Sequence, residues 1–137
     1  MRVPHFLASM LKEIDFDGVV DHVYLNSIKE PDKVSTFWKP TGLKPGQFKN
    51  DHSSWIAAPT VDEVTAWLIE NKKLFPTVAP TYDFEGDQVQ WTAGVYDIDT
   101  TSKTSILTET YEYYNSHREA VENSIHLALQ LITTLNR

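Results

Sequence analysis

Two four-residue patterns, TVDE at 60–63 and SHRE at 116–119, most constrain the fold. Each is a capping box, in which a Ser or Thr and a Glu three residues later satisfy each other's backbone N–H groups at a helix start. Apolar residues follow each box at helical spacing: Val61, Val64, Trp67 and Leu68 after the first, and Val121, Ile125, Ala128, Ile132 and Leu135 after the second. The spacing predicts helices over residues 61–73 and 116–135.

The segment between these helices has the composition of β-strands. Residues 77–84, 89–98 and 105–114 are rich in β-branched and aromatic side chains, and a Gly-containing turn at 85–87 separates the first two. Consecutive strands with short links favour an antiparallel meander. Pro80 has no backbone N–H to donate, so its strand is expected to lie at a sheet edge or to break there.

The N-terminal region predicts a further helix and strand. Apolar residues recur at helical spacing over 4–14, Gly18 is expected to adopt the left-handed cap conformation, and residues 19–25 read as a strand. We therefore predict a single α+β domain over residues 1–137. It has an antiparallel sheet of three to four strands, with two or three helices packed mainly on one face.

Residues 26–58 show neither helical nor strand periodicity and contain three prolines, which predicts a long irregular loop. This loop carries four large aromatic residues, Phe37, Trp38, Phe48 and Trp55. Such side chains either fold back onto the body of the protein or present a contact surface. Folding back is favoured because a solvated Trp adds no stability, but both interpretations stay open.

Composition excludes several classes of function. The chain has no cysteine, so disulfides, thiol catalysis and thiolate metal sites are all excluded. Its mean hydropathy of -0.36 and the lack of a long apolar run argue against a membrane span. The N-terminus lacks a signal-peptide pattern, so a cytoplasmic location is the simplest expectation. The net charge of -7 argues against a nucleic-acid partner.

The sequence contains no recognisable catalytic or metal-binding pattern. HExxH, G-x-S-x-G and a Gly-rich phosphate loop are all absent. Glu122 and His126 stand four residues apart on the last predicted helix, but two ligands are too few for a metal site. We therefore predict no catalytic residues, no metal and no cofactor, and the sequence leans away from an enzyme.

Two segments of the chain carry a resemblance to known proteins. The first is W-x-A-A-P-T at 55–60, which opens a helix containing W-L-x-E; the second is Y-x-S-x-x-E-A at 114–120 with the helix after it. This order resembles a group of small phage- and prophage-encoded proteins of Bacteroidetes type, whose function is unassigned. The matching residues are Ala58, Pro59, Thr60, Trp67, Leu68, Tyr114, Ser116, Glu119, Ala120, Ile125, Ala128, Leu129 and Ile132. The resemblance implies an accessory protein of a mobile element and no catalytic residues.

The favoured function is that of a non-enzymatic binding module. It would self-associate or bind a protein partner through the 26–58 loop, with Trp38 and Trp55 at the contact. The motivation is the absence of catalytic spacing together with aromatic residues in a loop.

Two alternatives remain open at the level of sequence. One is a small enzyme or small-ligand binder, with a pocket between the loop and the sheet that uses His22, His52, Tyr96 and Asp97. The other is an acidic mimic of nucleic acid, which requires carboxylates in rows on one surface.

Overall fold

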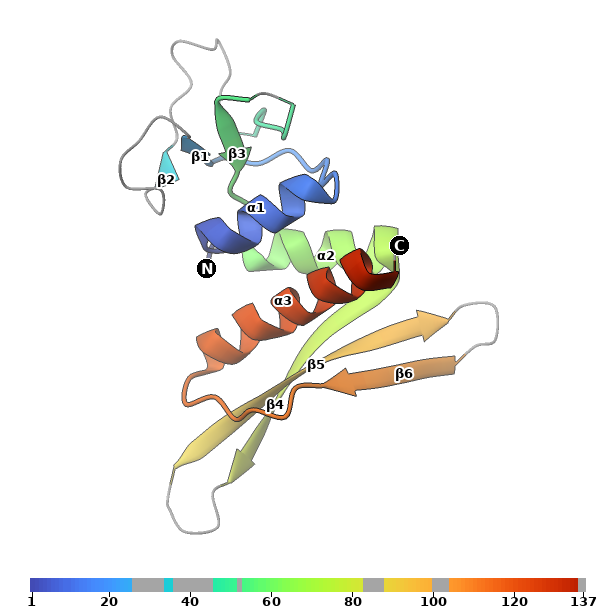
Figure 1. Cartoon of the computed structure of the whole chain (residues 1–137). Coiled ribbons are helices and arrows are strands. Elements are labelled where there is room, and N and C mark those ends of the chain that lie inside the picture. The colour runs from blue at the N-terminus through green and yellow to red at the C-terminus, as the bar shows by residue number, and fades with distance from the viewer. Residues whose placement is uncertain (26–33, 36–45, 52, 83–87, 100–103, 136–137) are drawn as a thin grey trace. The chain divides into compact units, whose positions relative to one another are not determined.

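The computed structural model describes residues 1–25, 34–35, 46–51, 53–82, 88–99 and 104–135. The chain divides into two compact units, unit 1 (Met1–Val64) and unit 2 (Thr65–Arg137). The described residues form three α-helices and two antiparallel sheets, which confirms the predicted α+β class (Figure 1). Each sheet has three strands. That the whole chain is one domain stays a prediction.

Unit 1 combines helix α1 with a small sheet. Helix α1 (His5–Glu13) buries Leu7, Ala8 and Leu11. The sheet has the order β2-β1-β3, formed by β1 (Val23–Leu25), β2 (Val34–Ser35) and β3 (Trp55–Ala57). Both pairings are antiparallel, so β1 is the central strand.

The end of α1 differs from the prediction for Gly18. The left-handed residue is Asp15, with φ 62°. The amide of Phe16 donates to the Leu11 carbonyl at 3.0 Å and that of Asp15 to Lys12 at 3.2 Å, which is the bonding pattern of a Schellman cap. Gly18 serves another purpose, because a Cβ there would lie 2.6 Å from Cζ of the Phe16 ring.

The segment 26–58, predicted to be irregular, contains strands β2 and β3. Strands of two and three residues are too short to show a period of two, so the sequence pattern could not reveal them. Strand β1 is also shorter than the predicted 19–25. Val20 instead forms a separate bridge with Phe48.

Helix α2 (Val61–Lys72) begins with the predicted capping box, and the boundary between the two units falls inside it. The amide of Thr60 donates to Glu63 Oε1 at 2.9 Å, and the amide of Glu63 donates to Thr60 Oγ1 at 3.2 Å. Val64 and Leu68 are fully buried. The structure therefore confirms this helix and the reason for its starting point.

Unit 2 is a three-stranded meander with one long helix on it. The strands β4 (Leu74–Tyr82), β5 (Val89–Asp99) and β6 (Thr104–Glu109) lie in sequence order, and α3 (His117–Leu135) packs on β4 and β5 (Figure 1). The amide of Glu119 donates to Ser116 Oγ at 3.1 Å, so the second capping residue also acts as predicted. The predicted turn at 85–87 lies outside the described residues.

The third predicted strand, 105–114, is interrupted. Glu109 pairs with Gly94 on β5, but the next bridge joins Tyr114 to Trp91. Four residues, 110–113, therefore stand opposite two, 92 and 93. The amide of Thr110 still donates to the Ala93 carbonyl, so residues 111–113 bulge out of the ladder. The bulge returns Tyr114 to the sheet just before α3 begins.

Candidate interaction surface

The sheet of unit 2 has one covered face. Successive side chains of a strand point to opposite faces, so Trp91, Ala93 and Val95 share a face of β5. Ala93 and Val95 are buried, and the Trp91 ring meets the ring of His117 on α3 edge-on, with centroids 4.8 Å apart. This is therefore the face on which α3 lies.

Three apolar side chains form a row across the opposite face. Phe75 on β4 pairs directly with Tyr96 on β5, and Tyr96 pairs directly with Leu107 on β6. Directly opposed side chains lie about 5 Å apart, so the three are in contact range. Phe75 is 40% exposed, Tyr96 37% and Leu107 40%. We call these three residues the open-face row.

Gly94 helps to hold this row in place. A Cβ on Gly94 would lie 3.1 Å from Leu107 Cδ1 and 3.1 Å from the Thr108 carbonyl oxygen. The side chain of Leu107 thus rests on the bare backbone of the neighbouring strand. An isolated glycine inside a strand is the signal by which sequence could indicate such a close approach.

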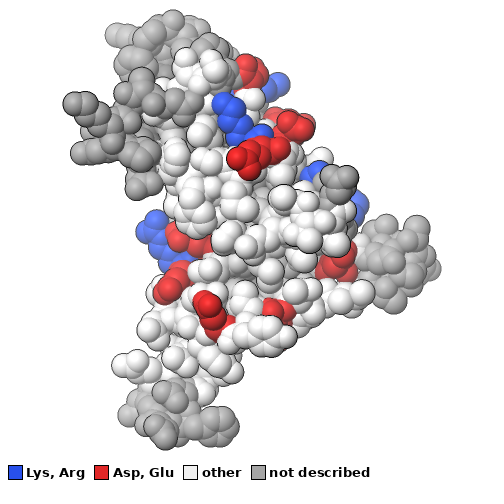
Figure 2. All heavy atoms as spheres, viewed as in Figure 1, with Lys and Arg blue, Asp and Glu red and all other residues white. Residues whose placement is uncertain are grey.

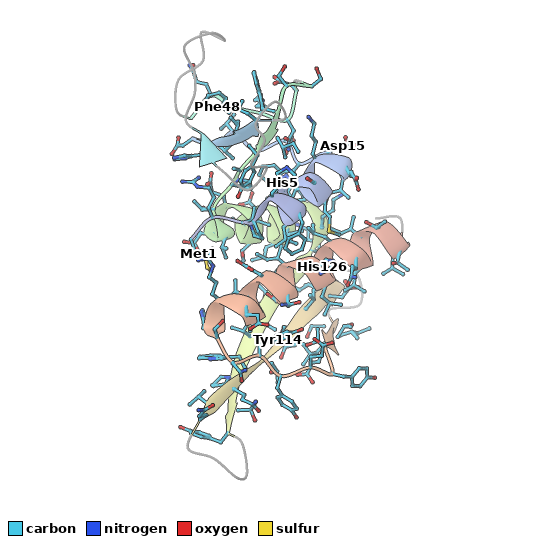
Figure 3. The ribbon with its side chains drawn as sticks, turned by 60° about the vertical axis from the view of Figure 1, so that its left-hand side comes forward. Met1, His5, Asp15, Phe48, Tyr114 and His126 are labelled. Atoms are coloured by element: carbon cyan, nitrogen blue, oxygen red, sulfur yellow. The ribbon has the colours of Figure 1, made fainter. Side chains whose placement is uncertain are left out.

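Two further aromatic residues are exposed beside the sheet. Tyr111 is fully exposed and Tyr113 is 62% exposed, both in the bulge that follows β6. Tyr114 is buried in a cluster with Ala93 and Ala120, and Figure 3 labels it on the segment that leads into α3. The tyrosines of this segment therefore divide into one that packs and two that face solvent.

The aromatic residues of the predicted loop pack in unit 1 where the structure describes them. Phe48, labelled in Figure 3, is fully buried. Trp55 is 4% exposed, and the centroids of the two rings lie 5.8 Å apart. Trp55 Nε1 donates to the Lys49 carbonyl at 2.8 Å. The structure thus confirms folding back for these two residues. Phe37 and Trp38 lie outside the described residues.

The structure places three of the four residues named for a ligand pocket, and the pocket itself stays a prediction. His52 lies outside the described residues, and His22 belongs to unit 1, directly before β1. Tyr96 and Asp97 are consecutive on β5, so their side chains point to opposite faces of the sheet of unit 2. Tyr96 belongs to the open-face row, whereas Asp97 lies on the α3 side.

His22 has an unusual environment within unit 1. Its Nδ1 is buried and has no hydrogen-bond partner among the described residues. Burial lowers the pKa of His22 below its ordinary value and nearby Arg2 lowers it further, while Asp21 and Glu63 act in the opposite direction. The neutral imidazole is therefore the form that the folded state favours.

We expect the free energy of unfolding to be lower in mild acid because of His22. Its folded-state pKa lies below the unfolded value of 6.5. Its contribution to stability is therefore complete above pH 6.5 and is lost as the pH falls toward the folded pKa. The free energy of unfolding should fall by at most about 1.4 kcal/mol per pH unit on this account, the limit for one proton. Urea titrations at several pH values should show a shallower decline for His22→Gln; equal declines in both proteins would contradict the assignment.

Among the described residues, no three His, Asp or Glu side chains are grouped so that they could hold a metal ion. No helix in that part of the chain is long and apolar enough to cross a membrane. Comparisons with protein-family models, curated proteins and solved structures found no match.

Proposed function

We propose that this protein is a non-enzymatic interaction module that binds a protein partner through the uncovered face of the unit 2 sheet. The observation that carries the proposal is the open-face row, whose three side chains are each more than a third exposed. Contiguous exposed apolar side chains favour association, because a partner removes their surface from water. Their backbones are held in a hydrogen-bonded ladder, so the surface is already formed before a partner arrives.

The proposed contact surface does not include Trp55, which the sequence had suggested as a contact residue. That side chain is buried against Phe48, so a partner could reach it only by unpacking unit 1. An accessory role in a mobile element remains part of the proposal and rests on the resemblance described above. The alternative of an acidic nucleic-acid mimic is less well supported. On the face shown in Figure 2, Asp and Glu side chains are scattered and several lie beside Lys or Arg.

Affinity capture with matched variants tests the proposal. Tyr96→Ser removes the central member of the open-face row, whereas Tyr82→Ser removes a 75% exposed tyrosine from the other face of the same sheet. A buried interface aromatic contributes about 2 kcal/mol or more, so Tyr96→Ser should weaken partner binding at least about 10-fold. Tyr82→Ser should bind as the wild type does. Equal retention by both variants, or no partner for the wild type, would overturn the proposal.

A further inference from the structure

The two edges of the unit 2 sheet differ in their capacity to pair with another strand. The amide of Ile98 donates to the Lys73 carbonyl, so the even-numbered residues of β5 direct their backbone groups toward β4. By the register of the ladder, the even-numbered residues of β4 then direct their backbone N–H and C=O groups away from β5. Pro76 and Pro80 occupy two of these outward positions and offer no N–H. Prolines placed in this way block an edge.

The outer edge of β6 has no such block. Trp91 and Tyr114 exchange both backbone hydrogen bonds at 2.8 Å, and the amide of Thr110 donates to the Ala93 carbonyl. The odd-numbered residues of β5 therefore direct their backbone N–H and C=O groups toward β6. The even-numbered residues of β6 direct theirs toward β5. Ser105, Leu107 and Glu109 are left directing their N–H and C=O groups outward. No strand among the described residues pairs with this edge.

The side chains of β6 are also poorly covered. Ile106, on the α3 side of the sheet, is 64% exposed, and Leu107, on the open face, is 40% exposed. An exposed strand with apolar side chains on both faces and an unpaired edge is a template for another strand. The exposed edge and the open-face row meet at Leu107.

The outward row is complementary to itself. In an antiparallel pair of two β6 strands with Leu107 at the two-fold axis, Leu107 faces Leu107 of the second copy, and Ser105 faces Glu109 of the second copy. Every outward N–H and C=O of the three residues then gains a partner.

This register also suits the side chains. The two Leu107 side chains would join the two open-face rows into one continuous apolar row. The two Glu109 carboxylates would be separated by four residues along the strand, about 13 Å, which exceeds the Debye length of about 8 Å at physiological salt. The pairing therefore gains apolar contact without a close repulsion between like charges.

We propose that a second copy of this chain occupies the β6 edge, giving a two-fold dimer with one sheet running through both copies. The inference goes beyond the proposed function, because it concerns the β6 edge, which adjoins the open-face row at Leu107. Self-pairing is the choice that the observations favour, because one short strand supplies both halves of a matched hydrogen-bond pattern. A strand from an unrelated protein is left as an outcome of the test.

Sedimentation equilibrium of the full chain, from about 1 μM to about 1 mM, tests this inference. The wild type should form dimers as its concentration rises. Ser105→Pro removes an outward N–H, as Pro76 and Pro80 do on β4, and should weaken dimerisation at least about 100-fold. Ser105→Ala keeps that N–H and should dimerise as the wild type does. A wild type that stays monomeric throughout overturns the dimer, and any strand bound at this edge must then come from another protein.

Two oppositely charged variants at the two-fold axis distinguish a loss of pairing from misfolding. Leu107→Lys and Leu107→Glu should each be monomeric, because like charges would face each other across the axis. Their mixture should form a heterodimer, which misfolded variants could not do; a mixture that stays monomeric contradicts the register. If Tyr96→Ser blocks a foreign partner while the wild type stays monomeric, the proposed function holds and the dimer alone fails.

Discussion

Replacing Trp55 with alanine is expected to reduce the free energy of unfolding of unit 1 by about 3–5 kcal/mol, the usual range for a buried aromatic residue. The ring is 4% exposed and packs edge-on against Phe48. Its Nε1 donates to the Lys49 carbonyl, and its own carbonyl accepts from Lys12 Nζ at 2.8 Å. The side chain thus fixes residues 46–51 against β3. Urea denaturation followed by amide exchange of unit 1 measures the loss.

A matched substitution separates packing from hydrogen bonding. Trp55→Phe keeps most of the buried ring but loses the Nε1 donor, so it should cost less, about 1–3 kcal/mol, including the unpaired Lys49 carbonyl. A Trp55→Ala protein with wild-type stability but lost partner binding would contradict the structural role. It would restore Trp55 as a contact residue, as the sequence first suggested.

Tyr114→Ala is expected to cost about 3 kcal/mol or more in unit 2, because it empties a buried aromatic site. The side chain is 6% exposed and packs with Ala93 beneath the start of α3, where Ala120 is fully buried. Its backbone also closes the bulge through two hydrogen bonds to Trp91. Thermal or urea unfolding followed by circular dichroism reports the change.

The adjacent tyrosine provides the control. Tyr113 is 62% exposed, so Tyr113→Ala should change the free energy of unfolding by no more than about 0.5 kcal/mol. Equal losses for Tyr113→Ala and Tyr114→Ala would mean that the division of this segment into one packed tyrosine and exposed neighbours is wrong.

The helices could be predicted because their signals are local. A capping box involves residues only three apart, and both Thr60 and Ser116 act in the structure as their sequence implies. The edge position of β4 could also be predicted, since Pro80 removes a donor whatever surrounds it. These features follow from the chemistry of neighbouring residues.

Features that depend on distant residues could not be predicted. Strand β3 exists because Trp55, Ile56 and Ala57 meet β1 some thirty residues earlier, and three residues show no period. Gly18 resembled a helix cap, but its small size is needed beside Phe16, and Asp15 takes the left-handed conformation instead. In both cases tertiary packing decided the local structure.

The candidate surface was only partly visible in the sequence. The strand predicted over 89–98 implies, by alternation, that Tyr96 lies on the other face from Ala93 and Val95, as it does in the structure. Sequence could not show that Phe75 and Leu107 lie on either side of Tyr96, because that depends on the register of three strands. The sequence also suggested a contact surface at the aromatic residues of 26–58, but two of them, Phe48 and Trp55, are part of the core of unit 1.

Amide hydrogen exchange at the β6 edge tests the central claim most directly. The amides of Ser105, Leu107 and Glu109 face outward, as does that of Val78 between the two prolines on β4. We expect exchange at the three β6 amides to slow as protein concentration rises, while Val78 exchanges at one rate throughout. Rates at β6 that do not depend on concentration, or equal protection of Val78, would contradict pairing at this edge.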